Sequence, residues 1–362
     1  MTIVSPLIRL YYMNEGIIQM YAAENSSFLA GIHQWGIEVI KIIQRIENPA
    51  LTILLKFITV LGTEILYVPL ILFIFWWIDE KQGLRFGILI LFCAWLNSFA
   101  KNIFKHPRPY NLEPAVGLAS ESSYGMPSGH AQQSITFWIP MAAWLSEIWT
   151  KKRRLIWAGI IFFVLLIGFT RLYLGVHFPT DLFAGWFLGG IIIAVWFIFR
   201  PRIEKKLASL EPRVQNIIAA IAALLMTGVF HKDRTYPALF LGFTLGYILM
   251  KSRFPFSARG EVRGKKPGAP VMILRCLTGL GGMAIIYLAL KFILPGEGSL
   301  FGNIPIWGEA SPLREPGRFI RYCLVGFWAS AGAPRLFQRM GLASAEAPKK
   351  SKDPDTSAKT ET

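Results

Sequence analysis

Charged residues are scarce in this sequence. Only 17% of its 362 residues are Asp, Glu, Lys or Arg, whereas 53% are hydrophobic and the mean hydropathy is +0.44. A soluble enzyme needs more polar surface than this, so the composition excludes a soluble multidomain protein. The apolar residues are also gathered into runs of about 20 residues, which is the length needed to cross a bilayer as a helix. The sequence therefore predicts an integral membrane protein.

Cysteine and acidic residues are scarce as well. The three cysteines, Cys93, Cys276 and Cys323, all lie in apolar runs without a CxxC motif, which excludes a disulfide framework and a zinc site built on cysteines. The 38 Lys and Arg residues exceed the 22 Asp and Glu residues and give a net charge of +16. The basic residues lie in short loops between apolar runs, so the surplus indicates membrane topology and predicts no nucleic-acid partner.

The apolar runs predict an all-α, polytopic transmembrane helical bundle of about nine spans. The runs cover residues 63–78, 86–105, 129–149, 155–172, 181–199, 215–231, 235–251, 271–294 and 318–337. Alternate loops are rich in Lys and Arg, and the positive-inside rule places this basic set in the cytoplasm. The N-terminus is then outside and the C-terminus inside. A short N-terminal segment and compact loops favour a bacterial inner (plasma) membrane.

Outside these spans, two terminal segments have distinct compositions. Residues 1–62 form an N-terminal interfacial segment, in which 35–46 have the spacing of an amphipathic helix. Such a helix fits the membrane surface, and it fits equally well against the bundle. Residues 341–362 are rich in Ala, Ser, Lys, Pro and Thr and predict a disordered cytoplasmic tail. In the additional transmembrane helices of 201–340, Arg275 lies near a span end and is expected to snorkel to the interface.

Polar residues gather near the outer ends of the spans between 86 and 199. The second predicted span runs outward, the third inward, the fourth outward and the fifth inward, so their outer ends meet on one face. The residues placed there are Lys101, Arg108, Ser128, His130, Arg171, His177 and Asp181. Topology and spacing alone thus predict one polar site on the extracytoplasmic side.

These residue types suit phosphate chemistry. Lysine and the two arginines can donate hydrogen bonds to phosphoryl oxygens, and the helix start at Ser128 and Gly129 offers free N–H groups to an anion. An Asp four residues after a His can orient the imidazole, and a second histidine, His130, is available as a general acid. Without a cluster of metal ligands, the cations must supply the charge stabilisation, so we expect no metal and no cofactor.

Each of these residues taken alone has a structural explanation. A single Lys101 or Arg171 at a span end is typical of a snorkelling side chain, and a single histidine is typical of a helix cap. We predict interface-belt positions for Tyr110, Tyr124, Trp138 and Tyr173, and structural roles for His33, His106 and His231. The joint occurrence of the polar residues on one face is what favours a catalytic site.

Three blocks of the sequence together resemble the signature of a known family. They are Lys101-x6-Arg108-Pro109, then Pro127-Ser128-Gly129-His130, then Arg171-x5-His177-x3-Asp181. In spacing and order they resemble the type 2 phosphatidic acid phosphatase superfamily, membrane lipid phosphatases with a histidine phosphatase/haloperoxidase-like core. One departure is Thr170, where the family usually has Ser, and both residues carry a hydroxyl.

The resemblance implies a role for each residue and makes 63–200 the phosphatase catalytic core. His177 would attack phosphorus to form a phosphohistidine, Asp181 would orient it, and His130 would protonate the leaving oxygen. The equatorial oxygens would be held by Lys101, Arg108, Ser128, Gly129 and Arg171.

The predicted function is metal-independent hydrolysis of a lipid phosphate or diphosphate in the bilayer, of the phosphatidate, phosphatidylglycerol phosphate or isoprenoid diphosphate type. Three alternatives stay open: a phosphatase for soluble esters such as sugar phosphates, a phosphotransferase, and a non-catalytic transporter or lipid-handling protein. The sequence leaves open the identity of the lipid, the role of the spans after 200 and the oligomeric state.

Overall fold

The structure, a computed structural model, is helical throughout the part of the chain that it describes. This part is 27–344 without 231, 263, 297–298, 302–303, 305–306 and 309–310. Within it the β-structure is confined to isolated bridge residues, such as the antiparallel bridge between Val262 and Lys265. The predicted all-α fold class is confirmed. The predicted disorder of the tail falls on residues that lie almost wholly outside this part.

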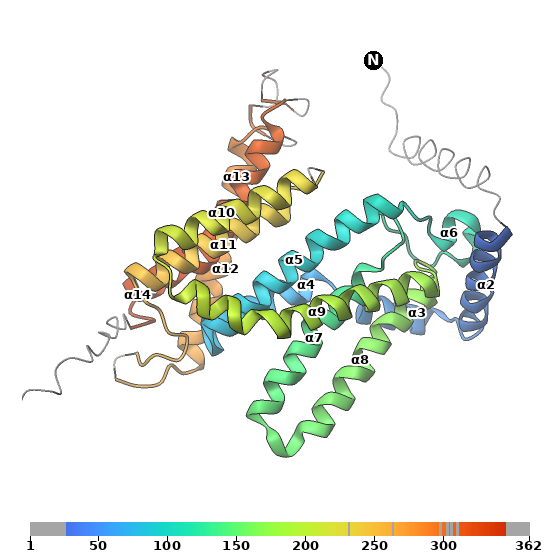
Figure 1. Ribbon diagram of the computed structural model, residues 1–362, viewed down its shortest axis with the longest axis horizontal. Helices are drawn as coiled ribbons and strands as arrows, with labels where there is room; N and C mark the ends of the chain where they lie inside the picture. Colours follow the sequence, from blue (N-terminus) through green and yellow to red (C-terminus); the bar gives the residue numbers. More distant parts are fainter. Residues whose placement is uncertain are drawn as a thin grey trace, which may run out of the picture. The chain divides into compact units, whose positions relative to one another are not determined.

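Each predicted apolar run coincides with a helix or a pair of consecutive helices (Figure 1). The helices are α2 (Ser27–Gln44), α3 (Pro49–Val60), α4 (Glu64–Phe73), α5 (Glu80–Phe104), α6 (Pro109–Leu112), α7 (Gly129–Ile148), α8 (Arg153–Tyr173), α9 (Pro179–Ala208), α10 (Pro212–Val229), α11 (Thr235–Arg253), α12 (Ala269–Ile293), α13 (Arg314–Phe327) and α14 (Ala333–Arg339). Short π-helical segments, Ile74–Ile78 and Trp328–Gly332, extend α4 and join α13 to α14.

Fewer helices qualify as membrane spans than the sequence predicts. By length and apolarity, 5 described helices could cross a bilayer, or 6 if the pair α3 and α4, bent by 44°, counts as one span. Helices α7, α11 and α13 are not among them. The inner face of α7 carries buried polar side chains such as Gln132 and Thr136, and α13 has only 14 residues. The prediction of about nine spans is therefore not reached.

The N-terminal part of the chain contains two helices, one of which was not predicted. Helix α2 begins earlier than the predicted 35–46, and its apolar face packs on protein, because Ile37 and Ile40 are buried with Val116 and Phe178. This contact supports the packed alternative for the amphipathic segment. Helix α3 packs against α8.

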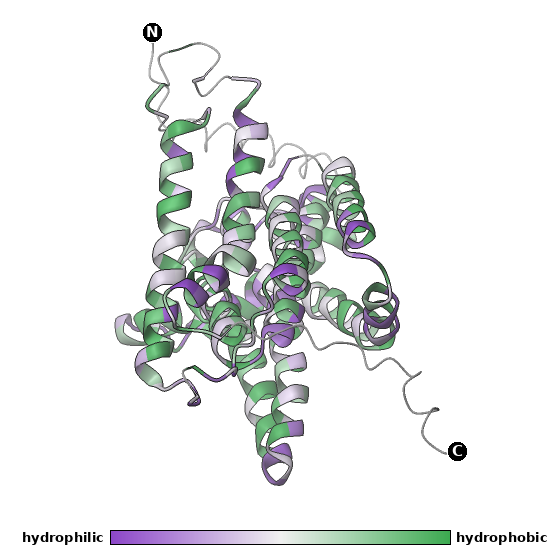
Figure 2. Cartoon of the chain, turned by 90° about the vertical axis from the view of Figure 1, so that its left-hand side faces the viewer, coloured by the Kyte–Doolittle hydropathy of each residue, from purple (hydrophilic) through white to green (hydrophobic). Residues whose placement is uncertain are grey.

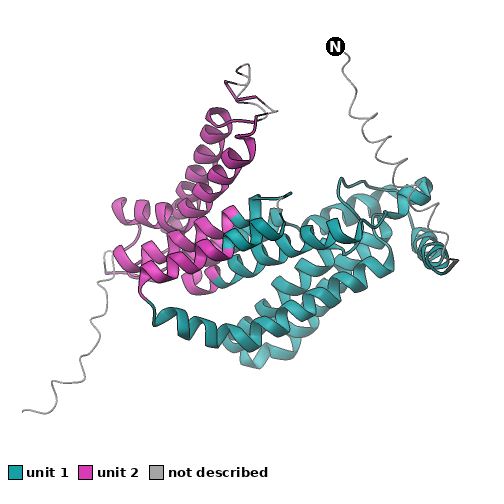
Figure 3. Ribbon diagram, turned by 45° about the horizontal axis from the view of Figure 1, so that its top comes forward, with its two compact units in different colours: residues 1–71, 85–210, 223–237 teal, residues 72–84, 211–222, 238–362 magenta. Residues whose placement is uncertain are grey.

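The chain divides into two compact units (Figure 3). Unit 1 comprises Met1–Ile71, Arg85–Leu210 and Ala223–Pro237, and unit 2 comprises Leu72–Leu84, Glu211–Ala222 and Ala238–Thr362. In unit 1, α7 and α8 form a hairpin and α7 also packs along α9. This packing is close, because a Cβ at Gly185 of α9 would lie 2.6 Å from the Ser128 carbonyl oxygen at the start of α7.

Helix α9 also has a face that is suited to lipid. Phe183, Phe187, Ile191 and Val195, spaced four residues apart, are all exposed. Hydrophobic residues, drawn in green, make up long stretches of many helices (Figure 2). A continuous exposed apolar stripe on a helix of 30 residues is what contact with the hydrocarbon of a bilayer requires.

Unit 2 is organised around an aromatic core and one buried arginine. Phe75, Trp76, Phe243 and Phe337 belong to this core. Arg275 is 0% exposed, and its guanidinium donates to the carbonyl oxygens of Leu342, Trp76 and Ala258 at distances of 2.7 to 3.0 Å. The prediction that Arg275 snorkels to the interface is wrong, because backbone carbonyls within the unit satisfy its donors.

Candidate active site

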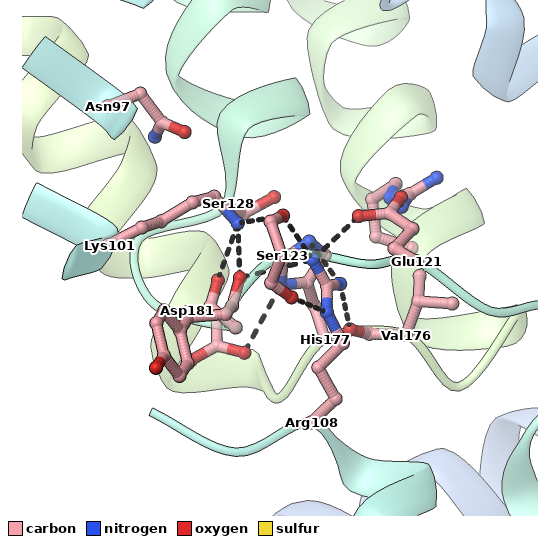
Figure 4. Close-up of polar contacts among 12 residues, drawn as sticks. Asn97, Lys101, Arg108, Glu121, Ser123, Ser128, Val176, His177 and Asp181 are labelled. Carbon is pink, nitrogen blue, oxygen red and sulfur yellow. Dashed lines mark hydrogen bonds and ion pairs between the residues drawn. The ribbon is translucent and has the colours of Figure 1, made fainter. Parts of the chain in front are cut away.

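The predicted site residues lie at one end of the helices of unit 1. Lys101 is in the last turn of α5, Arg108 precedes α6, Ser128 precedes α7 and Arg171 is in the last turn of α8. The loop between α8 and α9 then supplies His177, and the first turn of α9 supplies Asp181. Figure 4 shows these segments, far apart in the chain, meeting around the His177 ring.

Asp181 is positioned by the start of α9. Pro179 occupies the first turn, where its missing N–H costs no hydrogen bond, and Asp181 is the third residue of the helix. Its Oδ2 accepts a hydrogen bond from the Phe178 N–H at 3.0 Å, as a helix-capping carboxylate does. The same oxygen lies 3.2 Å from His177 Nδ1. The cap that starts the helix therefore also fixes the carboxylate against the imidazole.

His177 is fully buried between the carboxylate of Asp181 and the guanidinium of Arg108. Its Nε2 lies 3.3 Å from Arg108 Nη1, and a guanidinium can only donate, so Nε2 is the accepting nitrogen. The proton of the neutral ring is then on Nδ1, where it faces Asp181. Burial, with help from the positive charge of Arg108, holds the pKa of His177 well below its ordinary value, although Asp181 acts in the opposite direction. At neutral pH the ring is therefore neutral, and the lone pair on Nε2 faces the guanidinium of Arg108.

Arg108 organises the loop around the site. Its Nε donates to the Ser123 carbonyl at 2.7 Å, Nη1 to the Val176 carbonyl at 2.8 Å, and Nη2 to the Tyr124 carbonyl at 3.1 Å. These bonds tie the segment before α7 to the segment before α9, and they hold the guanidinium beside His177 (Figure 4). A lysine could not make this set of contacts.

Lys101 reaches the same loop from α5. Its Nζ donates to the carbonyl oxygen of Tyr124, and it lies 3.4 Å from both the Ser123 hydroxyl and the Gly125 carbonyl. Lys101 and Arg108 thus share acceptors in the segment that precedes α7. The structure brings these two predicted cations together.

Ser128 and Gly129 form the start of α7, as predicted. The Ser128 hydroxyl oxygen accepts from the Ala131 N–H at 3.5 Å, and the Ser128 N–H donates to the Asp181 carbonyl at 2.9 Å. A Cβ at Gly129 would lie 3.0 Å from Asn97 Oδ1, so the position has little room for a side chain. Asn97 itself bonds to the Pro127 carbonyl and to Gln132, which fixes α5 against the start of α7.

His130 follows in the first turn of α7 and is half-buried. Its ring packs against Gly62, where a Cβ would lie 3.3 Å from the ring carbon Cδ2. Within the described part of the chain no hydrogen bond joins His130 to another predicted site residue, so it is available to a group that enters the site.

Arg171 is joined to the site through a residue that sequence analysis missed. One side of its guanidinium donates to the Thr59 hydroxyl of α3 at 2.8 Å, and Nη2 contacts Glu121 Oε1. The other oxygen of Glu121 lies 2.7 Å from Arg108 Nη2. Glu121 therefore bridges the two arginines. Glu121 lies in an irregular loop, so the sequence shows no helical spacing that would predict where its side chain points. The available signal was the scarcity of acidic residues between the first two sequence blocks.

Two histidines that were expected to be structural also reach the site. His106 Nδ1 lies 3.1 Å from Asp181 Oδ1, and His106 Nε2 lies 2.9 Å from His33 Nε2 of α2. A row of side chains thus runs from His33 through His106 and Asp181 to His177. The position of His106, two residues before Arg108, was the available signal in the sequence.

The positive charge at this site is supplied by lysine and arginine side chains. Among the described residues, no three His, Cys, Asp or Glu side chains are grouped closely enough to hold a metal ion. The arrangement offers an accepting imidazole nitrogen, a carboxylate behind it and three cations around it. Such a site can bind a phosphoryl group and place its phosphorus in line with His177 Nε2.

The sequence also matches a known family over two segments. Residues 82–205 match the PAP2 superfamily, and residues 235–345 match the transmembrane extension of PAP2 superfamily phosphatases. All eight predicted site residues fall in the first match.

Relatives with assigned names are similar over much of the chain. Sphingosine-1-phosphate phosphatase 1 of Rattus norvegicus is 31% identical, over 82% of this chain and 74% of that protein. Sphingosine-1-phosphate phosphatase 2 of Mus musculus is 25% identical, over 80% of this chain and 88% of that protein. Phosphatidylglycerophosphatase B of Bacillus subtilis is 30% identical, over 44% of this chain and 80% of that protein.

Proposed function

We propose that this chain hydrolyses a lipid phosphate or diphosphate through a phosphohistidine on His177. The premise is that the chain belongs to the PAP2 superfamily and is a membrane lipid phosphate phosphatase with the transmembrane extension. The observation that supports this mechanism is the placement of the His177 ring between Arg108 and Asp181. Nε2 of His177 accepts from Arg108, and Nδ1 faces Asp181. A phosphoryl group bound by the arginine would meet the nitrogen that carries the lone pair.

In the first step, Nε2 forms a bond to phosphorus while the bond from phosphorus to the lipid oxygen breaks. The proton that this leaving oxygen needs comes from His130, and the positive charge that develops on His177 is balanced by Asp181. Lys101, Arg108 and Arg171, with the N–H groups at Ser128 and Gly129, hold the equatorial oxygens. Because these groups are cationic or dipolar and already in place, they stabilise the transition state without a metal ion.

In the second step, water attacks the phosphohistidine. His130, now neutral, takes the proton from water, the bond between nitrogen and phosphorus breaks, and inorganic phosphate leaves. The protonation states of both histidines are then those of the starting enzyme.

The place of the site in the fold supports a lipid substrate. The proposed catalytic residues lie at helix ends of the segment 63–200, where they would meet a lipid headgroup while its tails stay in the hydrocarbon. The rat and mouse relatives are named for sphingosine-1-phosphate, and the Bacillus relative for phosphatidylglycerophosphate. From the charge of the loops, we propose that the site is on the extracytoplasmic face, with the N-terminus outside and the C-terminus inside. From the compact loops, we propose a bacterial inner membrane.

The mechanism is tested with the purified full chain in detergent and EDTA. His177→Asn is expected to lower kcat/KM for phosphatidate by about 10⁴-fold or more, because it removes the nucleophile. With p-nitrophenyl phosphate, whose leaving group needs no acid, His130→Ala is expected to accumulate an acid-labile, base-stable phosphoenzyme. The double variant His130→Ala/His177→Asn serves as the control and should carry no label.

Each other outcome points away from the proposal in a specific way. Wild-type turnover by His177→Asn would exclude a phosphohistidine intermediate. Loss of activity in EDTA would exclude a metal-independent mechanism. Faster turnover of short, tail-less esters than of lipids would assign a soluble substrate, and transfer of label to an added alcohol in preference to water would assign a phosphotransferase. Binding of lipid phosphate without any release of phosphate would assign a lipid-handling protein.

A further inference from the structure

Glu121 occupies the place where an anion is expected to bind. Its Oε2 lies 2.7 Å from Arg108 Nη2, and its Oε1 contacts Arg171 Nη2. The two arginine side chains are only 2% and 3% exposed, whereas the Glu121 side chain is 29% exposed. A partly exposed carboxylate thus joins two buried guanidiniums. In geometry and charge its two oxygens stand where two phosphoryl oxygens would bind.

The backbone of Glu121 is held in this position by the fold. The Tyr110 hydroxyl, from α6, donates to the Glu121 carbonyl at 2.8 Å and accepts from the Glu121 N–H at 3.1 Å. On one side of it the Leu118 N–H donates to the Leu174 carbonyl, and on the other Arg108 holds the Ser123 carbonyl. The Tyr110 hydroxyl thus fixes this loop. The contact with the arginines is therefore part of the architecture of the site.

The two arginines cannot bind Glu121 and a phosphoryl group at the same time. Each guanidinium has a limited number of donors, and Arg108 already spends most of its donors on the carbonyls of the loop. A phosphoryl group that binds both arginines must take over the donors that now face Glu121. Because the side chain of Glu121 is partly exposed, it can swing outward while its clamped backbone stays in place.

We infer that Glu121 is an internal competitor for the phosphate site: a positioning residue, acting through Arg108 and Arg171, that closes the empty site and helps inorganic phosphate to leave after each turnover. This inference rests on the proposed function in taking the two arginines as phosphate ligands. After hydrolysis, the product is a multiply charged anion among three cations, which favours slow release. Return of the carboxylate to the arginines offsets that attraction.

An internal competitor has a quantitative consequence. If only the fraction of molecules with Glu121 displaced can bind, the apparent dissociation constant of every anion is raised by one and the same factor. Removing the negative charge should thus lower the KM for lipid phosphate and the inhibition constant of inorganic phosphate together. A residue that merely holds the arginines in place predicts the opposite, because its loss would weaken the binding of both.

The test uses Glu121→Gln in the full chain, with Glu113→Gln as the matched control. Glu113 lies in the same loop and makes the same kind of pair, but with Lys41 at 3.5 Å and away from the arginines. We expect Glu121→Gln to bind inorganic phosphate about tenfold more tightly, by calorimetry, and to lower KM for phosphatidate by a similar factor. We also expect kcat to fall, since product release becomes slower. Glu113→Gln should change none of these quantities.

A stability measurement covers the case in which the variant folds poorly. Glu121→Gln removes the carboxylate that two buried guanidiniums share, so its melting temperature in detergent should fall without phosphate and rise more steeply than the wild-type value when phosphate is added. Glu121→Asp, which keeps the charge on a shorter side chain, should lie between wild type and Glu121→Gln in all measurements.

The outcomes separate this inference from the proposed function. Weaker phosphate binding by Glu121→Gln, or a change in KM without the same change in the inhibition constant, overturns the role of Glu121 and leaves the hydrolysis mechanism intact. If the wild-type chain forms no phosphoenzyme but Glu121→Gln still binds phosphate more tightly, the mechanism fails and the internal competitor stands.

Discussion

His106 lies against the carboxylate of Asp181 on the side opposite to His177. His106 Nδ1 is 3.1 Å from Oδ1, whereas His177 Nδ1 is 3.2 Å from Oδ2. The carboxylate is 0% exposed, so both of its oxygens depend on protein groups for their partners. An Asp held from two sides cannot rotate away from the ring that it orients, and His33 in turn contacts the far nitrogen of His106. Helix α2 is thereby connected to His177, the proposed nucleophile, through the side chains of His33, His106 and Asp181.

We predict that His106→Phe lowers kcat/KM for a lipid phosphate by about tenfold, or about 1.4 kcal/mol, because one oxygen of a buried carboxylate loses its partner. His106→Gln, which can still donate to that oxygen, should retain most of the activity. Steady-state kinetics of the two variants check this prediction. Equal activity of wild type and His106→Phe would show that Asp181 needs only the His177 side and the Phe178 N–H.

The depressed pKa of His177 predicts how activity depends on pH. Burial and the charge of Arg108 lower the pKa, so the ring keeps its nucleophilic lone pair at pH values where an ordinary histidine is already protonated. We expect the acid limb that belongs to the nucleophile to lie below pH 6.5, after correction for ionisation of the substrate phosphate. The rate of phosphoenzyme formation, measured by rapid quench across the acid range, reports this limb. A limb at or above pH 6.5 would contradict it.

The same shift predicts a pH dependence of stability. The pKa in the folded state is below that in the unfolded state, so the unfolded chain binds the proton first as the pH falls. The stability that comes from burying the neutral ring is therefore complete above about pH 6.5. It is lost as the pH falls through the folded-state pKa. The melting temperature of the wild type should thus decline more steeply on the acid side than that of His177→Asn. His33, whose pKa is also lowered by burial and by His106, acts in the same direction in both proteins.

The meeting of the predicted cations with His177 and Asp181 was accessible from sequence because it depends on spacing and direction. A helix that ends near Lys101 and an antiparallel helix that begins near Asp181 must share one end of the bundle, whatever the side chains do. Glu121 and His106 were not accessible in this way. They lie in an irregular loop and at its edge, where the direction of a side chain is set by local hydrogen bonds such as those of Tyr110.

The limits of the fold prediction have similar causes. Helix α3 has only 12 residues and ends before Gly62, so it is too short to be recognised as a span on its own. The polar inner face of α7 lowers its hydropathy. Its side chains bond to α5, as Gln132 does with Asn97 and Thr136 with Cys93. Arg275 looked like an interfacial side chain from its place in the sequence. Its acceptors, including the Leu342 carbonyl, lie far from it in the chain and could not be read from any local pattern.

Gly175 is predicted to be essential for the loop that carries His177. Its φ is +66°, and an added Cβ would lie 1.8 Å from the Val116 carbonyl oxygen. Alanine there combines backbone strain with a clash against backbone, so Gly175→Ala should lower the free energy of unfolding by about 3 kcal/mol and reduce activity as His177 shifts. Thermal unfolding in detergent measures the first effect. The control is Gly159→Ala, a helical position with open space around it, which should be neutral.

Arg108→Lys is predicted to remove most activity while keeping the positive charge. The guanidinium of Arg108 donates in several directions at once, to the carbonyls of Ser123, Tyr124 and Val176 and to His177, and one ammonium group cannot replace that pattern. We expect kcat/KM to fall by about a hundredfold or more, comparable to the loss of a donor that stabilises transition-state charge.

The matched control for this change is Arg85→Lys. Arg85 makes a two-pronged pair with Glu204, from Nε at 2.8 Å and from Nη2 at 2.5 Å, between helices α5 and α9. The substitution breaks the same kind of planar contact without touching the site, so it should leave kcat/KM within about twofold of wild type. Steady-state assays of both variants, normalised to folded protein, compare the two. Similar losses in both would mean that Arg108 matters for folding alone, and full activity of Arg108→Lys would mean that charge without geometry is enough.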